Sequence, residues 1–158
     1  MDGETEVHSV DQIVPQVSNW ISQGSGKIGL MANVAALFFG QWEHASWVGF
    51  YLVGAWESPL MLGPFQGRPV PPALDWGTGI VGMAARERSV QLVHGVKHFA
   101  GYLAHVAETR CEAAIPIVCH GRVLAVLDAQ SKQVEGLGVL ELELMTKVAE
   151  LLSQAWCE

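Results

Sequence analysis

Charged side chains are scarce in this sequence of 158 residues. Asp, Glu, Lys and Arg make up 16% of it, against about 25% in a typical soluble domain. Only 9 residues are basic and 16 are acidic, so the net charge is −7, and the basic residues are scattered along the chain. Because affinity for nucleic acid depends on neutralising phosphates with Lys and Arg, this balance argues against nucleic acid as a partner.

Long apolar runs and leader signals are also lacking. The longest apolar stretch, residues 30–39, is interrupted by Asn33 and is far shorter than the roughly 20 residues that span a bilayer. The first four residues, M-D-G-E, have neither the basic n-region nor the apolar h-region of a signal peptide. We therefore expect no membrane span, no membrane partner and a cytoplasmic protein.

Cysteine and histidine lack the spacings that bind metals. Three cysteines are present, an odd number without a C-x-x-C motif: Cys111, Cys119 and Cys157. We expect them to be reduced thiols rather than parts of a disulfide scaffold or a zinc site. Three histidines, His94, His98 and His105, are spaced by 4 and 7 residues and have no acidic partner of the H-E-x-x-H kind. Neither a metal nor a cofactor is expected.

The sequence predicts one domain over residues 1–158. Half of its residues are apolar, and it has no repeats or linkers. Apolar periodicity predicts helices at 11–21, 28–39, 80–88 and 140–155. Strands are predicted at 46–53, 60–62, 90–93, 113–118 and 123–129, the last two joined by a hairpin loop at 120–121. The Gly/Pro segment 63–79 is interpreted as a long functional loop. The fold class is α+β, with helices packed on a hairpin-rich sheet.

Four motifs occur in a fixed order: W-V-G-F-Y at 47–51, G-P-F-Q-G at 63–67, G-x-G-x-x-G-x-A-A at 77–85 and V-L-D at 126–128. Together they resemble the free methionine-(R)-sulfoxide reductase branch of the GAF domains, over about residues 30–131. The resemblance implies a six-stranded antiparallel sheet flanked by helices, a small closed pocket and often a homodimer. The third motif also fits a dinucleotide fingerprint, but Pro71 and Pro72 precede it instead of a parallel strand, so we interpret it as a tight turn into a helix.

The resemblance also indicates what this sequence lacks. Placed without gaps, the three cysteines of that family fall on Pro71, Val81 and His105, and the second Asp of its D-I-D-S motif falls on Gln130. Sulfoxide reduction needs a thiolate that attacks sulfur and a second thiol that resolves the oxidised cysteine as a disulfide. We therefore expect a GAF domain in which the family's cysteines, and with them its redox chemistry, are missing.

Four positions match residues that the family retains: Trp47, Tyr51, Glu112 and Asp128. Two carboxylates can hold an ammonium group, and a Trp face can cover a methyl-sulfinyl or other small apolar end. We predict that these residues bind a small cationic or zwitterionic ligand. In the alternative interpretation, the two aromatic residues belong to the ordinary core and Glu112 pairs locally.

The simplest register of the 113–129 hairpin conflicts with a site that contains both Glu112 and Asp128. A two-residue loop at 120–121 pairs Ala113 with Asp128. That register places Glu112 and Asp128 on opposite faces of the sheet. A bulge or break, near Pro116, is needed for both to line one pocket.

Two other functions remain open. One is an active reductase with a relocated cysteine, for which Cys111 beside Glu112 is the candidate. Cys119 cannot resolve Cys111 within a straight strand, because eight extended residues span roughly 26 Å. The other is a structural dimerisation module, favoured by the low charge content and the amphipathic terminal helices. We expect a homodimer, with a contact that uses the helix at 11–21.

Overall fold

The structure is a computed structural model, and it describes residues 10–157. Its helices are α1 (Val10–Ser22), α2 (Lys27–Gln41), α3 (Gly79–Glu87), the 3-10 turn η1 (Val96–His98) and α4 (Val139–Trp156). Its strands are β1 (Ala45–Leu52), β2 (Leu60–Gly67), β3 (Ala73–Leu74), β4 (Gln91–His94), β5 (Cys111–Cys119) and β6 (Arg122–Ser131). The four α-helices expected from periodicity are all present, and the α+β class is confirmed.

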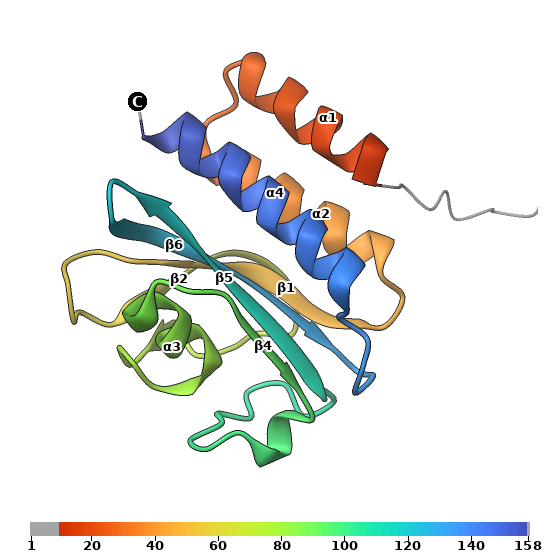
Figure 1. Ribbon diagram of the computed structural model, residues 1–158, viewed down its shortest axis with the longest axis vertical. Coiled ribbons are helices and arrows are strands. Elements are labelled where there is room, and N and C mark those ends of the chain that lie inside the picture. The colour runs from red at the N-terminus through yellow and green to blue at the C-terminus, as the bar shows by residue number, and fades with distance from the viewer. Residues whose placement is uncertain (1–9, 158) are drawn as a thin grey trace, which may run out of the picture.

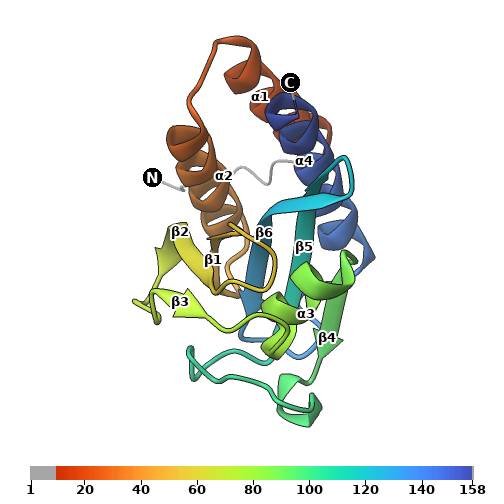
Figure 2. The ribbon, with the colours of Figure 1, turned by 90° about the vertical axis from the view of Figure 1, so that its left-hand side faces the viewer.

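The six strands form one antiparallel sheet in the order β3-β2-β1-β6-β5-β4. Helices α2 and α4 pack against one face, and α1 packs on α4 (Figure 1). Helix α3 lies on the other face, as the turned view shows (Figure 2). Because both faces are covered, β1 is buried along almost its whole length, as a central strand should be.

Two apolar cores follow from this layering. The helix-side core contains the buried face of α2 and alternate residues of the central strands, including Phe50, Ile115 and Leu127. The core on the α3 side contains the residues between them, including Trp47, Tyr51 and Val126. Successive side chains of a strand point to opposite faces, so neighbouring residues of β1 and β6 belong to different cores.

The interpretation of residues 63–79 as one structureless loop was wrong. Its first part completes β2, which pairs with β1, and Ala73–Leu74 forms β3. Glycine serves close packing here rather than a loop, because a Cβ on Gly67 would lie 2.8 Å from the ring of Trp47. The interpretation of the later glycines as a tight turn into a helix agrees with positive φ at Gly77 and Gly79, directly before the body of α3.

The β5–β6 hairpin contains the bulge that the site requires. The predicted loop at 120–121 is present, with positive φ at both residues as in a type I′ turn. Val118 pairs with Val123, but Ile117 pairs with Ala125, so the register shifts by one residue. The predicted pairing of Ala113 with Asp128 was therefore wrong. Ala114 pairs with Asp128 and Glu112 with Gln130, which places both acidic residues on one face.

The expectation that all three cysteines are reduced thiols was also wrong. Cys119 and Cys157 form a disulfide, whereas Cys111 is free and buried. The two bonded residues are 38 positions apart, and α4 returns to the hairpin end only in the folded chain. Sequence spacing could not reveal that approach. Within residues 10–157, no helix combines the length and apolarity that crossing a membrane requires.

Candidate functional site

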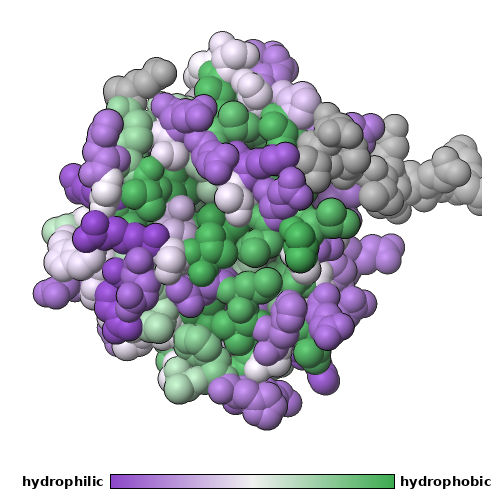
Figure 3. Space-filling view, viewed as in Figure 1, coloured by the Kyte–Doolittle hydropathy of each residue, from purple (hydrophilic) through white to green (hydrophobic). Residues whose placement is uncertain are grey.

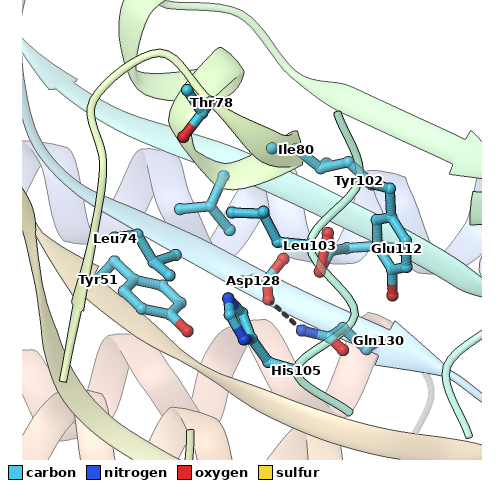
Figure 4. Close-up of a pocket in the computed structure, with 12 residues that line it drawn as sticks. Tyr51, Leu74, Thr78, Ile80, Tyr102, Leu103, His105, Glu112, Asp128 and Gln130 are labelled. Atoms are coloured by element: carbon cyan, nitrogen blue, oxygen red, sulfur yellow. Dashed lines mark hydrogen bonds between the residues drawn. The ribbon is translucent and has the colours of Figure 1, made fainter. Parts of the chain in front are cut away.

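A small cavity lies between the sheet and α3, on the face that carries the two acidic residues (Figure 4). Strand β1 supplies Tyr51, β5 supplies Glu112 and β6 supplies Asp128. Twelve residues line it: Tyr51, Leu74, Thr78, Gly79, Ile80, Val81, Tyr102, Leu103, His105, Glu112, Asp128 and Gln130. Three of the four residues predicted for the site therefore meet in one cavity.

Small residues flank Asp128 on both neighbouring strands. Its partners across the two adjacent strands are Gly49 on β1 and Ala114 on β5. A side chain at Gly49 is excluded, because a Cβ there would lie 2.4 Å from the Cβ of Phe65 and 2.6 Å from the ring of Trp47. Gly49 thus makes room for Trp47 and Phe65, which pack over β1 beside Asp128.

The two carboxyl groups are buried and point toward each other (Figure 4). Asp128 is 0% exposed and Glu112 is 5% exposed. Burial raises the pKa of Asp128 to about 7, and burial together with the neighbouring Asp128 charge raises the pKa of Glu112 well above its usual range. Near neutral pH the pair therefore retains a proton that separate, exposed carboxyls would release.

A chain of hydrogen bonds fixes one side of Asp128. The Gln130 amide donates to Asp128 Oδ2 at 2.9 Å, and the Thr109 hydroxyl donates to Gln130 Oε1 at 2.8 Å. The Ser46 hydroxyl lies 2.8 Å from that of Thr109. Asp128 Oδ1, by contrast, has no hydrogen-bond partner among the described residues. One carboxylate oxygen is therefore held by a fixed amide, whereas the only further hydrogen-bond neighbour of Asp128 among the described residues is the Glu112 carboxyl, which donates when it is protonated.

Trp47, the fourth predicted residue, lies behind the cavity and does not line it. It is 0% exposed and stacks between Tyr51 and Phe65, with ring centroids 5.7 Å and 5.4 Å apart. Its indole N–H donates to the Arg68 carbonyl at 3.2 Å. Trp47 therefore positions Tyr51, whose phenol faces the cavity and has a pKa raised by burial and by the two acidic groups.

A loop that the resemblance indicated only through His105 lies over the cavity. Tyr102, Leu103 and His105 come from the irregular segment between η1 and β5, and burial raises the pKa of the Tyr102 phenol. That segment carries no periodic signal, and the resemblance indicated it only through the cysteine position that falls on His105. Gln130 was detectable, because strand alternation puts it on the same face as Asp128, two residues away.

The enclosed space is small. Its volume is about 20 Å³, which suits a water molecule or two. An occupant as large as an amino acid therefore requires the closing loop to move.

The three positions on which the family's cysteines were placed do not behave alike. Val81 and His105 line the cavity, whereas Pro71 is exposed in the turn between β2 and β3 and does not line it. None of the twelve lining residues is a cysteine. Cys111 is buried in the helix-side core, with its thiol 4.0 Å from the Leu137 carbonyl and its pKa raised by burial. The sheet separates this thiol from the cavity.

This chain is similar to a known domain family and to individual proteins within it. The GAF domain family matches residues 28–156. The free methionine-R-sulfoxide reductase of Saccharomyces cerevisiae is 29% identical over 143 residues, covering 87% of this chain and 76% of the relative. The enzyme of the same name from Escherichia coli is 33% identical over 104 residues, covering 66% and 62%.

Solved structures have a similar fold. The reduced form of fRMsr of Staphylococcus aureus has a TM-score of 0.85 and 27% identity, covering 92% of this chain and 94% of that one. The six-stranded antiparallel sheet with helices on both faces, expected from the resemblance, is thus present in full. The chain belongs to the GAF domain family, and its fold is closely related to that of the free methionine-R-sulfoxide reductases.

Proposed function

We propose that this GAF domain binds a small cationic or zwitterionic ligand in the cavity over Glu112 and Asp128, and that it lacks thiol-based reductase chemistry. The main support is the buried pair of carboxyls at the cavity, in which Asp128 Oδ1 has no fixed donor and only the neighbouring Glu112 can supply a proton. A buried carboxylate oxygen without a donor costs free energy. An ammonium group supplies both the donor and the compensating charge.

The walls of the cavity suit the rest of such a ligand. Leu74, Ile80 and Leu103 offer apolar surface, and the phenol of Tyr51 lies beside them. An amino acid or small amine combines one ammonium group with a short apolar end, which matches this division of the walls. The names of the yeast and Escherichia coli relatives indicate free methionine sulfoxide as one candidate of this chemistry.

The positions of the three cysteine sulfur atoms support the absence of reductase chemistry. Cys111 faces the helix-side core, and Cys119 is joined to Cys157 at the far end of β5. Neither contributes to the cavity lining. A reductase that uses a relocated cysteine would need a thiol within bonding distance of a sulfoxide held in the cavity, so this arrangement disfavours that alternative.

A homodimer forms part of the proposal. Apolar side chains gather along the face that α4 crosses (Figure 3), and Val139 and Leu140 at the start of α4 are 80% and 69% exposed. The apolar residues Ile13 and Val17 of α1 are already buried within the chain, so α4 offers the more open surface. Light scattering should return twice the chain mass of 17.1 kDa. A mass of one chain at micromolar protein would reject a stable dimer.

Ligand binding is tested by a thermal-shift screen with amino acids, their sulfoxides and small amines, followed by calorimetry with the best ligand. Glu112→Gln should weaken binding by roughly 2–5 kcal/mol, because the ammonium loses one partner of a buried charge pair. Asp128→Asn should have a similar effect.

Glu143→Gln is the matched control, since Glu143 is a half-exposed carboxylate on α4 that pairs with Lys147. Equal affinity in the three variants would show that the carboxyl pair is structural. A screen without any ligand would favour the structural dimerisation module.

A further inference from the structure

A second chemically active cluster lies at the opposite end of β5 from the cavity. Cys119 is the last residue of β5, and Cys157 directly follows α4. Their Cα atoms are 5.5 Å apart and their sulfur atoms are bonded. Figure 1 shows the C-terminal end of α4 beside the β5–β6 hairpin. Both cysteines are partly exposed, so small reagents in solution can reach them.

Contacts other than the disulfide hold the two cysteines together. The Ser153 hydroxyl donates to the Val118 carbonyl, which ties the last turns of α4 to the end of β5. The Cys157 backbone N–H donates to the Ser153 carbonyl at 2.9 Å and so continues the helical pattern to the cysteine. We therefore expect both thiols to stay close after reduction.

His120 completes the cluster. It is exposed, and the hairpin turn holds it at a φ of 50°, directly after Cys119. One ligand atom from each of Cys119, His120 and Cys157 lies within 4.8 Å of the other two. Around a tetrahedral zinc ion, Zn–S bonds of about 2.3 Å and Zn–N bonds of about 2.0 Å put these ligand atoms roughly 3.5–3.8 Å apart. Small side-chain rotations connect the two arrangements.

We propose that the reduced Cys119 and Cys157, with His120, form a site for Zn²⁺ or a similar thiophilic divalent cation, and that disulfide and metal are alternative states of this site. A dithiol reductant donates two electrons, which breaks the S–S bond and leaves two protein thiols and an oxidised reductant. Zn²⁺ then displaces one proton from each thiol and accepts the neutral imidazole nitrogen. Three protein ligands leave a fourth position open to water.

This site is separate from the proposed ligand site. Cys119 lies seven positions after Glu112 on β5, which corresponds to roughly 23 Å of extended strand. Failure of either proposal therefore leaves the other standing. Within residues 10–157, this is the one group of three His, Cys, Asp or Glu side chains close enough to share an ion.

The test is a titration of the reduced full-length chain with Co²⁺, a spectroscopic substitute for Zn²⁺, in the absence of oxygen. We expect thiolate-to-cobalt charge-transfer absorption at one equivalent, its displacement by Zn²⁺, and protection of two thiols from alkylation. Cys119→Ser and Cys157→Ser should each abolish the charge-transfer band. His120→Asn should weaken binding by at least about tenfold, whereas Cys111→Ala, which removes the buried third thiol, should leave binding unchanged.

Several results would overturn the proposal. They are the absence of cobalt binding by the reduced, folded chain, binding that persists in Cys119→Ser, and His120→Asn binding as tightly as the unaltered chain. If reduction alone unfolds the chain by circular dichroism, added Zn²⁺ should refold it, because binding and folding are then coupled. Failure to refold would also contradict the proposal.

Discussion

The two faces of the sheet are made by alternate residues of the same strands, yet they differ in chemistry. On β6, Leu127 and Ala129 point into an apolar core under the helices, whereas Asp128 and Gln130 point into the cavity. Helices α2 and α4 cover one face of the sheet, whereas α3 and an irregular loop cover the other. A strand with both faces covered can thus carry stability on one set of residues and a binding site on the other.

The two faces also differ in how their buried polar groups are hydrogen-bonded. The strand residues of the helix-side core are apolar apart from the thiol of Cys111 and the hydroxyl of Ser131, which is hydrogen-bonded to His44 and Gln133. The cavity side contains two buried carboxyls, a fixed amide and one carboxylate oxygen without a partner. Unsatisfied buried groups cost stability, so their presence on one face alone indicates that this face serves binding.

The largest loss of stability is expected from a substitution in the helix-side core. Leu127→Ala should lower the free energy of unfolding by about 2–5 kcal/mol, because it leaves a void in a fully buried core. Asp128→Asn, one residue along, should leave the free energy of unfolding unchanged or raise it near neutral pH, since it removes a buried charge. Denaturant unfolding of both variants checks this. A larger loss for Asp128→Asn would show that the carboxyl stabilises the fold.

The disulfide provides the second test, because it joins α4 of the helix layer to the hairpin. Loop-closure entropy for a 38-residue separation gives about 4 kcal/mol of stabilisation over the reduced chain. Cys157→Ser should lower the free energy of unfolding by up to that amount and leave ligand affinity in the cavity unchanged. Cys111→Ala supplies the comparison without a broken cross-link. Loss of ligand affinity in Cys157→Ser would show that the two faces are coupled.

The pH dependence of stability tests the cavity side. The pKa of Asp128 is raised to about 7 in the folded chain, so the folded state binds a proton that the unfolded state has released above about pH 4. The free energy of unfolding should therefore fall as pH rises, by up to about 1.4 kcal/mol per pH unit for one proton, until pH passes about 7. Glu112, whose pKa is also raised, adds to the fall.

Asp128→Asn should make this profile shallower between about pH 5 and about pH 8, a window above the titration of ordinary carboxylates, and the contribution of Glu112 should remain. Glu143→Gln should keep the full slope. Stability that rises with pH in the unaltered chain would contradict the raised pKa values.

The sequence predicts the regular elements well, because each has a strong local signal. The apolar periodicity of α1 and α4 and the β-branched runs of β5 and β6 are examples. It also indicates Glu112 and Asp128 as partners, and the one-residue bulge that unites them was expected as a requirement. Its exact place depends on side-chain packing along both strands, which no local pattern records.

Features that depend on long-range approach were not predictable. The disulfide needs the end of α4 to meet the hairpin, and the closing loop with Tyr102 and Leu103 has no periodic pattern. Trp47 was placed in the site by resemblance, but its ring stacks behind Tyr51, where only packing could put it. Gly67 of β2 was interpreted as part of a loop, but it lies in a strand and accommodates the ring of Trp47.

The most direct measurement of the central claim, a cavity that binds without thiol chemistry, is a turnover assay with free L-methionine-(R)-sulfoxide and a dithiol donor. The position of Cys111 behind the sheet and of Cys119 in a distant disulfide predicts no methionine above the background without protein. Methionine formation that disappears in Cys111→Ser or Cys119→Ser would contradict the account and establish a relocated catalytic thiol.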